Sequence, residues 1–372
     1  MIPVEVMKRS LGFTLLASIA LAVSACGGGS DKQQLLVFSG EANRLNAYAP
    51  DQDDEKQTVI ERRSDDPNGW DINAQICFDP DGSRRFIAGE DTGQPNPPQG
   101  WGFFQLNGSF IGSLSATRIG KLTPTYQGAS DNAENYGCGF LSDGRLVTTD
   151  VGNQASGPGN GQLIMWFPPF DRFDVPYCKI DIAIGTAQQI YVDNQDRVYV
   201  ASARENPGIY RYNGPFPTSN TANGGCGRRD STGAPLADDL NKELFIPASG
   251  DIPTPNGLIP SLSGGFFVSS VLNGVIAEFA PNGSFLRRVL QPPSGEVLGP
   301  NPFSTGSPLG LGIDRSGTIY YADIGLVIRN GNIGPGDNTG TVRRLRFEGS
   351  TPQQPETLDS GLDFPDGIGI LE

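Results

Sequence analysis

The side chains that could do chemistry in this sequence are carboxylates and amides, because the 372-residue chain contains no histidine. The absence of histidine excludes Ser-His-Asp triads, Cys-His pairs and His-ligated zinc or iron. Lys and Arg number 27 against 41 Asp and Glu, which gives a net charge of −14. Such a chain cannot neutralise a row of phosphates, so we expect no nucleic-acid partner. No pattern in the sequence predicts haem, flavin or nucleotide binding.

Two groups of polar side chains stand at equivalent points of a recurring pattern. The first group stands where an apolar run begins, at Asp366, Asn256, Gln188 and Asn135. The second stands where the next apolar run ends, at Glu90 and Asp150. Carboxylates crowded at one site raise each other's pKa unless a cation lies among them, and Ca²⁺ accepts oxygen ligands without His or Cys. These residues could bind a divalent cation and supply a general base, or they are strand-end residues that bond backbone and solvent.

The runs that position these residues form an internal repeat. An apolar strand, a tight turn and a second apolar strand recur at 74–91, 136–150, 188–202, 256–270 and 309–323, with a truncated copy at 364–371. Equivalent positions are about 58 residues apart on average. A third strand follows in each unit, and then a turn and a fourth strand. Asn107-Gly108 and Asn282-Gly283 mark two of these turns, because Asn-Gly between strands indicates a hairpin.

Four antiparallel strands per repeat, arranged around an axis, predict an all-β, six-bladed β-propeller over residues 34–372. The composition agrees, since 50 Gly and 30 Pro supply many turns while 37% hydrophobic residues supply a core. Residues 34–62 hold outer strands with no inner strand before them, and the copy at 364–371 has nothing after its inner strand. We therefore expect both chain ends to complete one blade. The starts of the inner strands should surround the mouth of the central channel.

The repeats resemble the six-bladed propellers of the gluconolactonase/senescence-marker-protein superfamily and the related NHL-repeat proteins. The residues that carry the resemblance are Pro255-Asn256-Gly257-Leu258, Pro365-Asp366-Gly367-Ile368 and the turn Asp79-Pro80-Asp81-Gly82. These motifs are short and are shared by propellers of many functions. The similarity covers roughly residues 34–372.

The resemblance implies a divalent ion, such as Ca²⁺, held by the first residues of the inner strands of four blades. Carried onto this sequence, those positions are Asp366, Gln188, Asn256 and either Asn135 or Tyr136. The sequence departs from the superfamily, whose members supply two carboxylates among the four ligands, because only Asp366 is acidic here. This departure puts catalysis more in doubt than metal binding.

The N-terminus predicts a bacterial lipoprotein signal over residues 1–25. Lys8 and Arg9 precede a short apolar run that ends in Val23-Ser24-Ala25-Cys26, and a Gly-rich stretch follows. We expect Cys26 to be lipidated, residues 26–33 to be a flexible tether, and the protein to be anchored in the cell envelope. Gly27 after the cysteine favours the outer membrane. The alternative is an ordinary signal peptide with an incidental cysteine.

The four remaining cysteines suit an exported protein, in which disulfides form. Cys178 and Cys226 lie in loop-rich sequence and are the predicted bridge. Cys77 and Cys138 lie in apolar strands, where buried free thiols and a second bridge both fit. An insert at 213–243 follows a third strand and is expected to project from the face opposite the channel mouth.

Two functions follow from these observations. The first is a lipoprotein whose channel mouth, or insert, binds a small molecule, a glycan or a protein, and the incomplete metal ring favours it. The alternative is a Ca²⁺-dependent lactonase or esterase of the gluconolactonase-like superfamily. In that case Asp366 and Asn256 would hold the metal, and Glu90 or Asp150 would act as the base.

Overall fold

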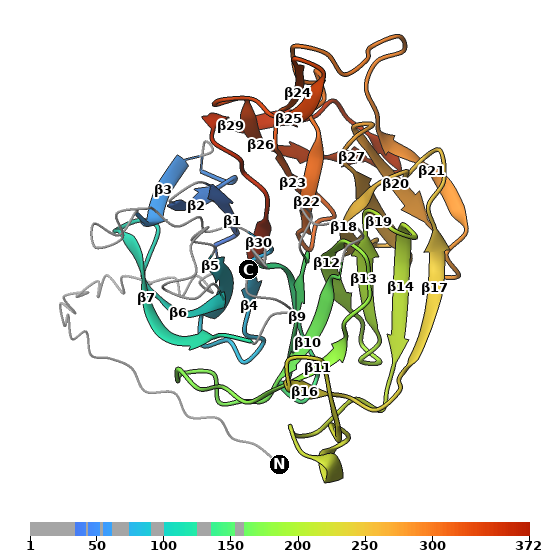
Figure 1. Ribbon diagram of the computed structural model, residues 1–372. Coiled ribbons are helices and arrows are strands. Elements are labelled where there is room, and N and C mark those ends of the chain that lie inside the picture. The colour runs from blue at the N-terminus through green and yellow to red at the C-terminus, as the bar shows by residue number, and fades with distance from the viewer. Residues whose placement is uncertain are drawn as a thin grey trace, which may run out of the picture. The chain divides into compact units, whose positions relative to one another are not determined.

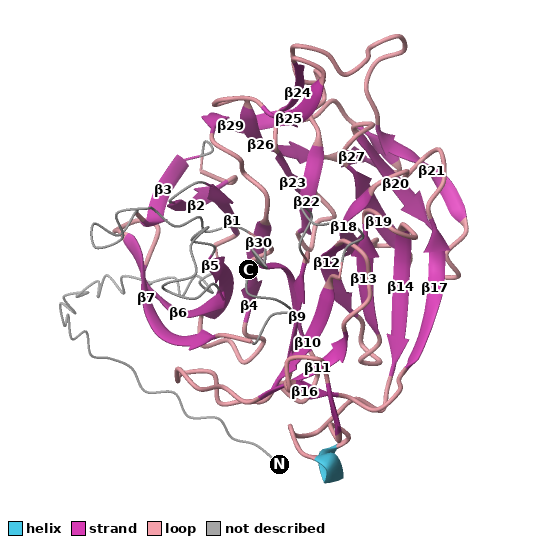
Figure 2. Ribbon diagram, in the orientation of Figure 1, coloured by secondary structure: helices cyan, strands magenta, loops and turns pink. Residues whose placement is uncertain are grey.

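The computed structural model describes residues 34–41, 44–52, 55–61, 74–90, 100–124, 135–152 and 160–372. The predicted signal sequence, Cys26 and the tether lie outside these ranges. Within them the chain is built almost entirely of β-strands (Figures 1 and 2), and its one helical element is the 3-10 turn η1 (Ala222–Gly224). No helix in the described ranges is long and apolar enough to cross a membrane.

Six antiparallel sheets with four principal strands each form the blades, numbered here from the inner strand outward. Blade 1 contains β30 (Ile368–Leu371), β1 (Leu36–Glu41), β2 (Arg44–Ala49) and β3 (Glu55–Ile60). Blade 2 contains β4 (Cys77–Phe78), β5 (Arg85–Glu90), β6 (Gly100–Gly108) and β7 (Leu114–Leu122). Blade 3 contains β8 (Asn135–Phe140), β9 (Leu146–Asp150), β10 (Gln162–Trp166) and β11 (Tyr177–Asp181).

The remaining blades follow the same order. Blade 4 contains β12 (Ala187–Val192), β13 (Val198–Ser202), β14 (Gly208–Asn213) and β17 (Asn241–Pro247). Blade 5 contains β18 (Pro255–Pro260), β19 (Phe266–Ser270), β20 (Val275–Phe279) and β21 (Phe285–Leu290). Blade 6 contains β22 (Pro308–Ile313), β23 (Ile319–Asp323), β26 (Gly340–Leu345) and β29 (Glu356–Leu362). Two short hairpins branch from blade 6: β24 (Leu326–Arg329) with β25 (Asn332–Pro335), and β27 (Phe347–Glu348) with β28 (Thr351–Pro352).

This arrangement confirms the predicted all-β, six-bladed propeller. Blade 1 closes the ring as expected, because β1 pairs with β2 on one side and with β30 on the other. Phe38 of β1 is opposite Gly369 of β30, so residues from both ends of the described chain share one sheet. The tight turns of the repeat are present too. In blade 3 the Gly144 amide donates to the Leu141 carbonyl, and Gly144 has a φ of 83°, which glycine adopts without strain.

The insert differs from its expected position. It leaves the end of β14 and runs along the outer edge of blade 3, where β16 (Pro235–Leu236) pairs in parallel with β11 and β15 (Arg228–Arg229) pairs with β16. The insert thus extends the blade 3 sheet to six strands instead of only projecting from the opposite face. Apolar residues of the insert explain this position, because Phe216 and Ala237 belong to the same buried cluster as Leu163 and Ile180 of blade 3.

A disulfide and a buried ion pair hold the insert against blade 3. Cys178 and Cys226 form a disulfide, the pairing predicted from the sequence, with their Cα atoms 6.1 Å apart. Beside it, Lys179 Nζ lies 2.7 Å from Asp230 Oδ2, and both side chains are fully buried. Burial opposes ionisation of Asp230, but hydrogen bonds from Lys179 and Thr232 outweigh it and lower the pKa of this carboxyl below its usual value.

Candidate functional site

The predicted ring residues lie at the starts of the inner strands and are buried. Asn256 and Gln188 contact each other: the Asn256 amide nitrogen donates to Gln188 Oε1 at 3.1 Å. Asn256 Oδ1 in turn accepts the backbone N–H of Val271 at 3.2 Å. The structure therefore brings these two predicted ligands together. Their amide groups bond each other and the β19–β20 connection.

Asp366 fastens the closing blade to its neighbours. Its Oδ1 accepts the backbone N–H of Ala74, which precedes β4 of blade 2, at 3.0 Å. The Tyr136 hydroxyl of blade 3 donates to the Asp366 carbonyl oxygen at 3.3 Å. These bonds give Asp366 a structural role at the junction of three blades.

Asn135 turns toward blade 2. Its amide nitrogen donates to the backbone carbonyl of Gly100, at the start of β6, at 2.8 Å. This bond points the amide to a third strand and not to the Asn256–Gln188 pair.

The two predicted bases, Asp150 and Glu90, bond groups of their own blades. Asp150 accepts the backbone N–H of Gly152 and the amide of Gln162, each at 3.1 Å. Glu90 forms ion pairs with two residues of the outer strand β7, Arg118 at 3.2 Å and Lys121 at 3.5 Å.

Asp323 of blade 6 repeats the bonding of Asp150. Its Oδ1 accepts the N–H of Gly325 at 2.9 Å, just as Asp150 accepts that of Gly152. Its Oδ2 accepts the hydroxyl of Thr341 from the third strand, where Gln162 serves Asp150. The same arrangement in two blades indicates that these carboxylates secure strand ends.

The ring residues do not fit a high-affinity cation site. The described residues include no group of three or more His, Cys, Asp or Glu side chains that could hold a metal ion. Asp366 supplies the one negative charge among the four predicted ligands, and three of the side chains bond protein groups in separate directions. Ca²⁺ sites gain affinity from the number of charged ligands and from their convergence.

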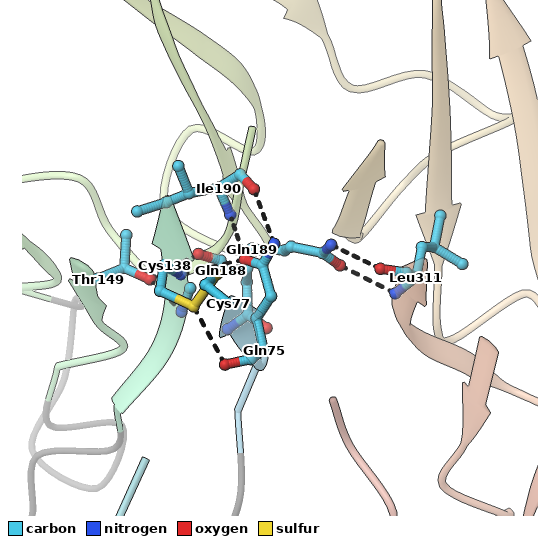
Figure 3. The surroundings of a disulfide bond; sticks show 9 residues. Gln75, Cys77, Cys138, Thr149, Gln188, Gln189, Ile190 and Leu311 are labelled. Atoms are coloured by element: carbon cyan, nitrogen blue, oxygen red, sulfur yellow. Dashed lines mark hydrogen bonds between the residues drawn. A yellow bond between two sulfur atoms is a disulfide. The ribbon is translucent and has the colours of Figure 1, made fainter. Parts of the chain in front are cut away.

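Two glutamines that the sequence reading did not single out cross between the inner strands (Figure 3). Gln189 of blade 4 skips blade 5 and bonds Leu311 of blade 6, donating to its carbonyl at 2.8 Å and accepting its N–H at 2.9 Å. Gln75 of blade 2 reaches Ile190 of blade 4, donating to its carbonyl at 3.2 Å. Gln75 Oε1 also accepts the N–H groups of Cys138 and Ile190. Each side-chain amide thus both donates to and accepts from the backbone of another inner strand, as a neighbouring strand does in a β-sheet.

A signal for these glutamines exists in the repeat. The inner strands of the six repeats have equivalent first positions at Ala74, Tyr136, Gln188, Asn256, Leu309 and Asp366. The next residue is glycine in four blades and glutamine in two: Gly137, Gly257, Gly310, Gly367, Gln75 and Gln189. The glycines are required where the inner strands touch, since a Cβ at Gly137 would lie 2.5 Å from the Gln188 carbonyl oxygen. In blades 2 and 4 the glutamines replace these glycines and bond the inner strands of other blades.

A disulfide reinforces the same wall. Cys77 of β4 and Cys138 of β8 are bridged, with their Cα atoms 6.0 Å apart, which resolves the question that the sequence left open (Figure 3). Above it, an apolar cluster gathers residues from three blades at the mouth: Tyr136, Val151, Val271, Leu309, Ile324 and Leu326. Leu298 packs against this mouth cluster. The mouth therefore combines saturated polar groups with an apolar cover.

Solved structures share this fold. No protein-family model and no curated protein sequence matches the chain significantly. A luciferin-regenerating enzyme is 12% identical with a TM-score of 0.54, over 91% of this chain and 97% of that one. A chain of a nidogen/laminin complex is 12% identical with a TM-score of 0.53, over 90% and 98%. Regucalcin, a calcium-binding protein from Agrobacterium tumefaciens, is 13% identical with a TM-score of 0.47, over 78% and 77%.

At these identities the likeness concerns the fold. The matched structures with TM-scores above 0.5 come from an enzyme and from a nidogen/laminin complex, so the shared architecture does not select one activity. What the likeness does establish is the arrangement predicted from the repeats. The chain is a six-bladed β-propeller, a fold that it shares with these solved structures.

Proposed function

We propose that this protein is a cell-envelope lipoprotein whose channel-mouth face binds a ligand without converting it chemically. The observation that carries the proposal is the bonding of the mouth residues. Asp150 and Asp366 accept backbone N–H groups, and Asn256 bonds Gln188. Groups held in this way shape a surface, whereas a catalytic base must be within reach of a substrate proton.

The mouth face is suited to binding because connections from several blades converge there. The mouth cluster is buried, with each of its members no more than 8% exposed, so it packs beneath these connections and does not itself offer apolar surface to a ligand. The ligand class is a small molecule, a glycan or a protein segment. The glutamines beneath the mouth support binding at the face over passage through the channel.

Anchoring in the envelope rests on the N-terminal sequence and is tested separately. Replacing Cys26 with serine removes the acceptor of the lipid, so Cys26→Ser should accumulate as unprocessed precursor without incorporated fatty acid. Wild-type protein should carry the lipid and sediment with the membrane, mainly the outer membrane. Mature-sized, lipid-free protein from the Cys26→Ser variant would contradict a lipoprotein signal.

A Ca²⁺-dependent lactonase or esterase is the competing function, and the resemblance of the Pro255–Leu258 and Pro365–Ile368 motifs to the gluconolactonase superfamily suggests it. A direct assay separates the two: hydrolysis of aryl esters and sugar lactones by purified protein in millimolar Ca²⁺. We expect no hydrolysis above background. Activity that Asp366→Asn and Asp150→Asn both abolish, while Asp323→Asn retains it, would replace our proposal with the hydrolase.

The same variants report on metal binding. A cation at the ring would be held by one charge, so its affinity would be weak, with a dissociation constant of about 10⁻⁴–10⁻³ M. Such a cation would raise the melting temperature of the wild type with increasing Ca²⁺ but not that of Asp366→Asn. We expect equal responses of both proteins to Ca²⁺. A rise confined to the wild type would place the ion at Asp366.

A further inference from the structure

Beside the mouth, blade 5 carries a pocket with a volume of about 570 Å³. Leu272, Asn273 and Val275 from the β19–β20 connection form one side with Arg288 of β21, and residues 291–298 with Phe303 form the other. We call this the blade-5 pocket. Its size lies within the range of roughly 300–1,000 Å³ of small-molecule sites. It belongs to the same face as the mouth cluster, because Leu298 both lines it and packs against that cluster.

The charged groups of the blade-5 pocket already have hydrogen-bond partners. Arg288 Nε donates to Asp251 Oδ1 at 2.8 Å. Glu296 accepts the backbone N–H of Ser304 at 2.7 Å and its hydroxyl at 2.8 Å. A charged ligand would have to compete with these partners, so the pocket favours an uncharged one.

The exposed apolar side chains in the walls of the pocket favour a ligand that is mainly apolar. Val297 is 79% exposed and Leu272 is 37% exposed, although both are large and apolar. Phe303 and Leu298 add further apolar surface. Covering these side chains removes apolar area from water, which stabilises a complex in proportion to the area covered.

Asn273 specifies a polar group on the ligand. Its amide nitrogen donates to the Asp251 carbonyl at 3.0 Å, and this bond fixes which end of the amide is the oxygen. The oxygen, Oδ1, is buried and has no hydrogen-bond partner within the described part of the chain. A buried acceptor without a donor is costly, but Oδ1 is shielded from solvent in this conformation, so a ligand N–H or O–H relieves the cost only when the Asn273 side chain turns to present this oxygen to the pocket.

We infer that the blade-5 pocket is the ligand site of the mouth face, and that its ligand is an uncharged small molecule with an apolar body and one N–H or O–H donor. The inference rests on the proposed function, since it says where and what the mouth face binds. Asn273 sets specificity by accepting the donor. The walls formed by Leu272, Val297 and Phe303 hold the apolar body.

Two probes that differ only in the donor test this inference. Indole has an apolar body and one N–H, whereas 1-methylindole lacks the donor. We expect indole to bind the wild type about three- to tenfold more tightly than 1-methylindole in calorimetric titration, the effect of one net hydrogen bond. Equal affinity for the two probes would overturn the role of Asn273.

Variants locate the site. Asn273→Leu removes the acceptor and should abolish the difference between the probes, and Asn273→Asp keeps an acceptor and should restore it. Val297→Asp, at an exposed position that folding does not need, should weaken both probes. Asn301→Leu is the matched control, since Asn301 is exposed on the same connection and does not line the pocket.

The outcomes separate the inference from the proposed function. Binding that survives Asn273→Leu and Val297→Asp but is lost in Asp366→Asn would overturn the blade-5 pocket and leave mouth-face binding intact. Absence of binding by either probe would also overturn the inference. Ca²⁺-dependent hydrolysis would overturn the proposed function whatever the probes do.

Discussion

The channel and the blade-5 pocket differ in whether the side-chain amides that line them have hydrogen-bond partners. In the channel, Gln189 and Gln75 use both ends of their amides to bond the inner strands of other blades. In the pocket, Asn273 uses its nitrogen and leaves its buried oxygen without a partner within the described residues. The same functional group is saturated in one place and unsaturated in the other.

This difference distinguishes residues that stabilise the fold from residues that bind a ligand. A saturated amide stabilises the strands that it joins, and replacing it should cost stability and leave ligand affinity unchanged. An unsaturated amide contributes little to the folded state, and replacing it should change affinity and leave stability unchanged. Each prediction below tests one side of this comparison, from the largest expected effect to the smallest.

The channel disulfide should give the largest effect. Cys77 and Cys138 are 61 residues apart, so the bridge restricts a long loop of the unfolded chain. Removing it with Cys77→Ala and Cys138→Ala should lower the free energy of unfolding by about 4 kcal/mol. Urea unfolding measures this change, and indole affinity should stay unchanged. Lost affinity in a folded variant would show that the channel and the pocket are coupled.

The buried ion pair between Lys179 and Asp230 tests the same idea with charged groups, because each has its partner in the folded state. Asp230→Asn leaves Lys179 buried without its counter-charge, so we expect a loss of about 3 kcal/mol. Because the pKa of Asp230 is lowered in the folded state, its contribution is complete above the unfolded value near 3.8 and fades as pH falls through the folded value.

Urea unfolding at several pH values checks this sign. The difference between wild type and Asp230→Asn should be full at pH 7 and should shrink below about pH 4. A difference that is constant down to pH 2 would contradict a role for the Asp230 charge. The wild-type curve at high salt is a control, since a fully buried pair is screened little.

The channel glutamine should have a smaller effect. Gln189→Leu keeps similar bulk but leaves the N–H and carbonyl of Leu311 without their partner, which should cost about 2 kcal/mol. Gln75→Leu is the companion variant on the other side of the axis. Unchanged stability of both in thermal and urea unfolding would refute the structural role given to the glutamines.

Asn273→Leu should have the smallest effect on stability, within about 0.5 kcal/mol of the wild type. One bond to the Asp251 carbonyl is lost, but a buried unsatisfied oxygen is removed with it. A drop of 2 kcal/mol or more would mean that Asn273 is part of the architecture. The contrast between channel and pocket would then fail.

The sequence predicted much of the fold because repeats report strand order directly. The inner-strand motifs, the Asn-Gly turns and the half-repeats at the two ends were sufficient for six blades and their closure in blade 1. The Cys178–Cys226 bridge followed from loop position. The course of the insert did not, because β16 pairs with β11 through backbone groups that carry no sequence signature.

The positions of the ring residues at the starts of the inner strands were predicted, but their hydrogen bonds were not. Repeat alignment placed Asp366, Asn256 and Gln188 at the inner-strand starts, which is where they lie. It could not show that Asn256 bonds Gln188, or that Glu90 pairs with Arg118 two strands away. These partners depend on the direction that each side chain takes between packed blades, which spacing along one strand does not specify.

A crystal structure of the protein soaked with indole tests the central claim most directly. We predict electron density for indole in the blade-5 pocket, with its N–H within hydrogen-bond distance of Asn273 Oδ1 and its ring against Phe303 and Val297. Density over Asp366 and Asn256, or none in the blade-5 pocket under conditions in which calorimetry records binding, would contradict the account.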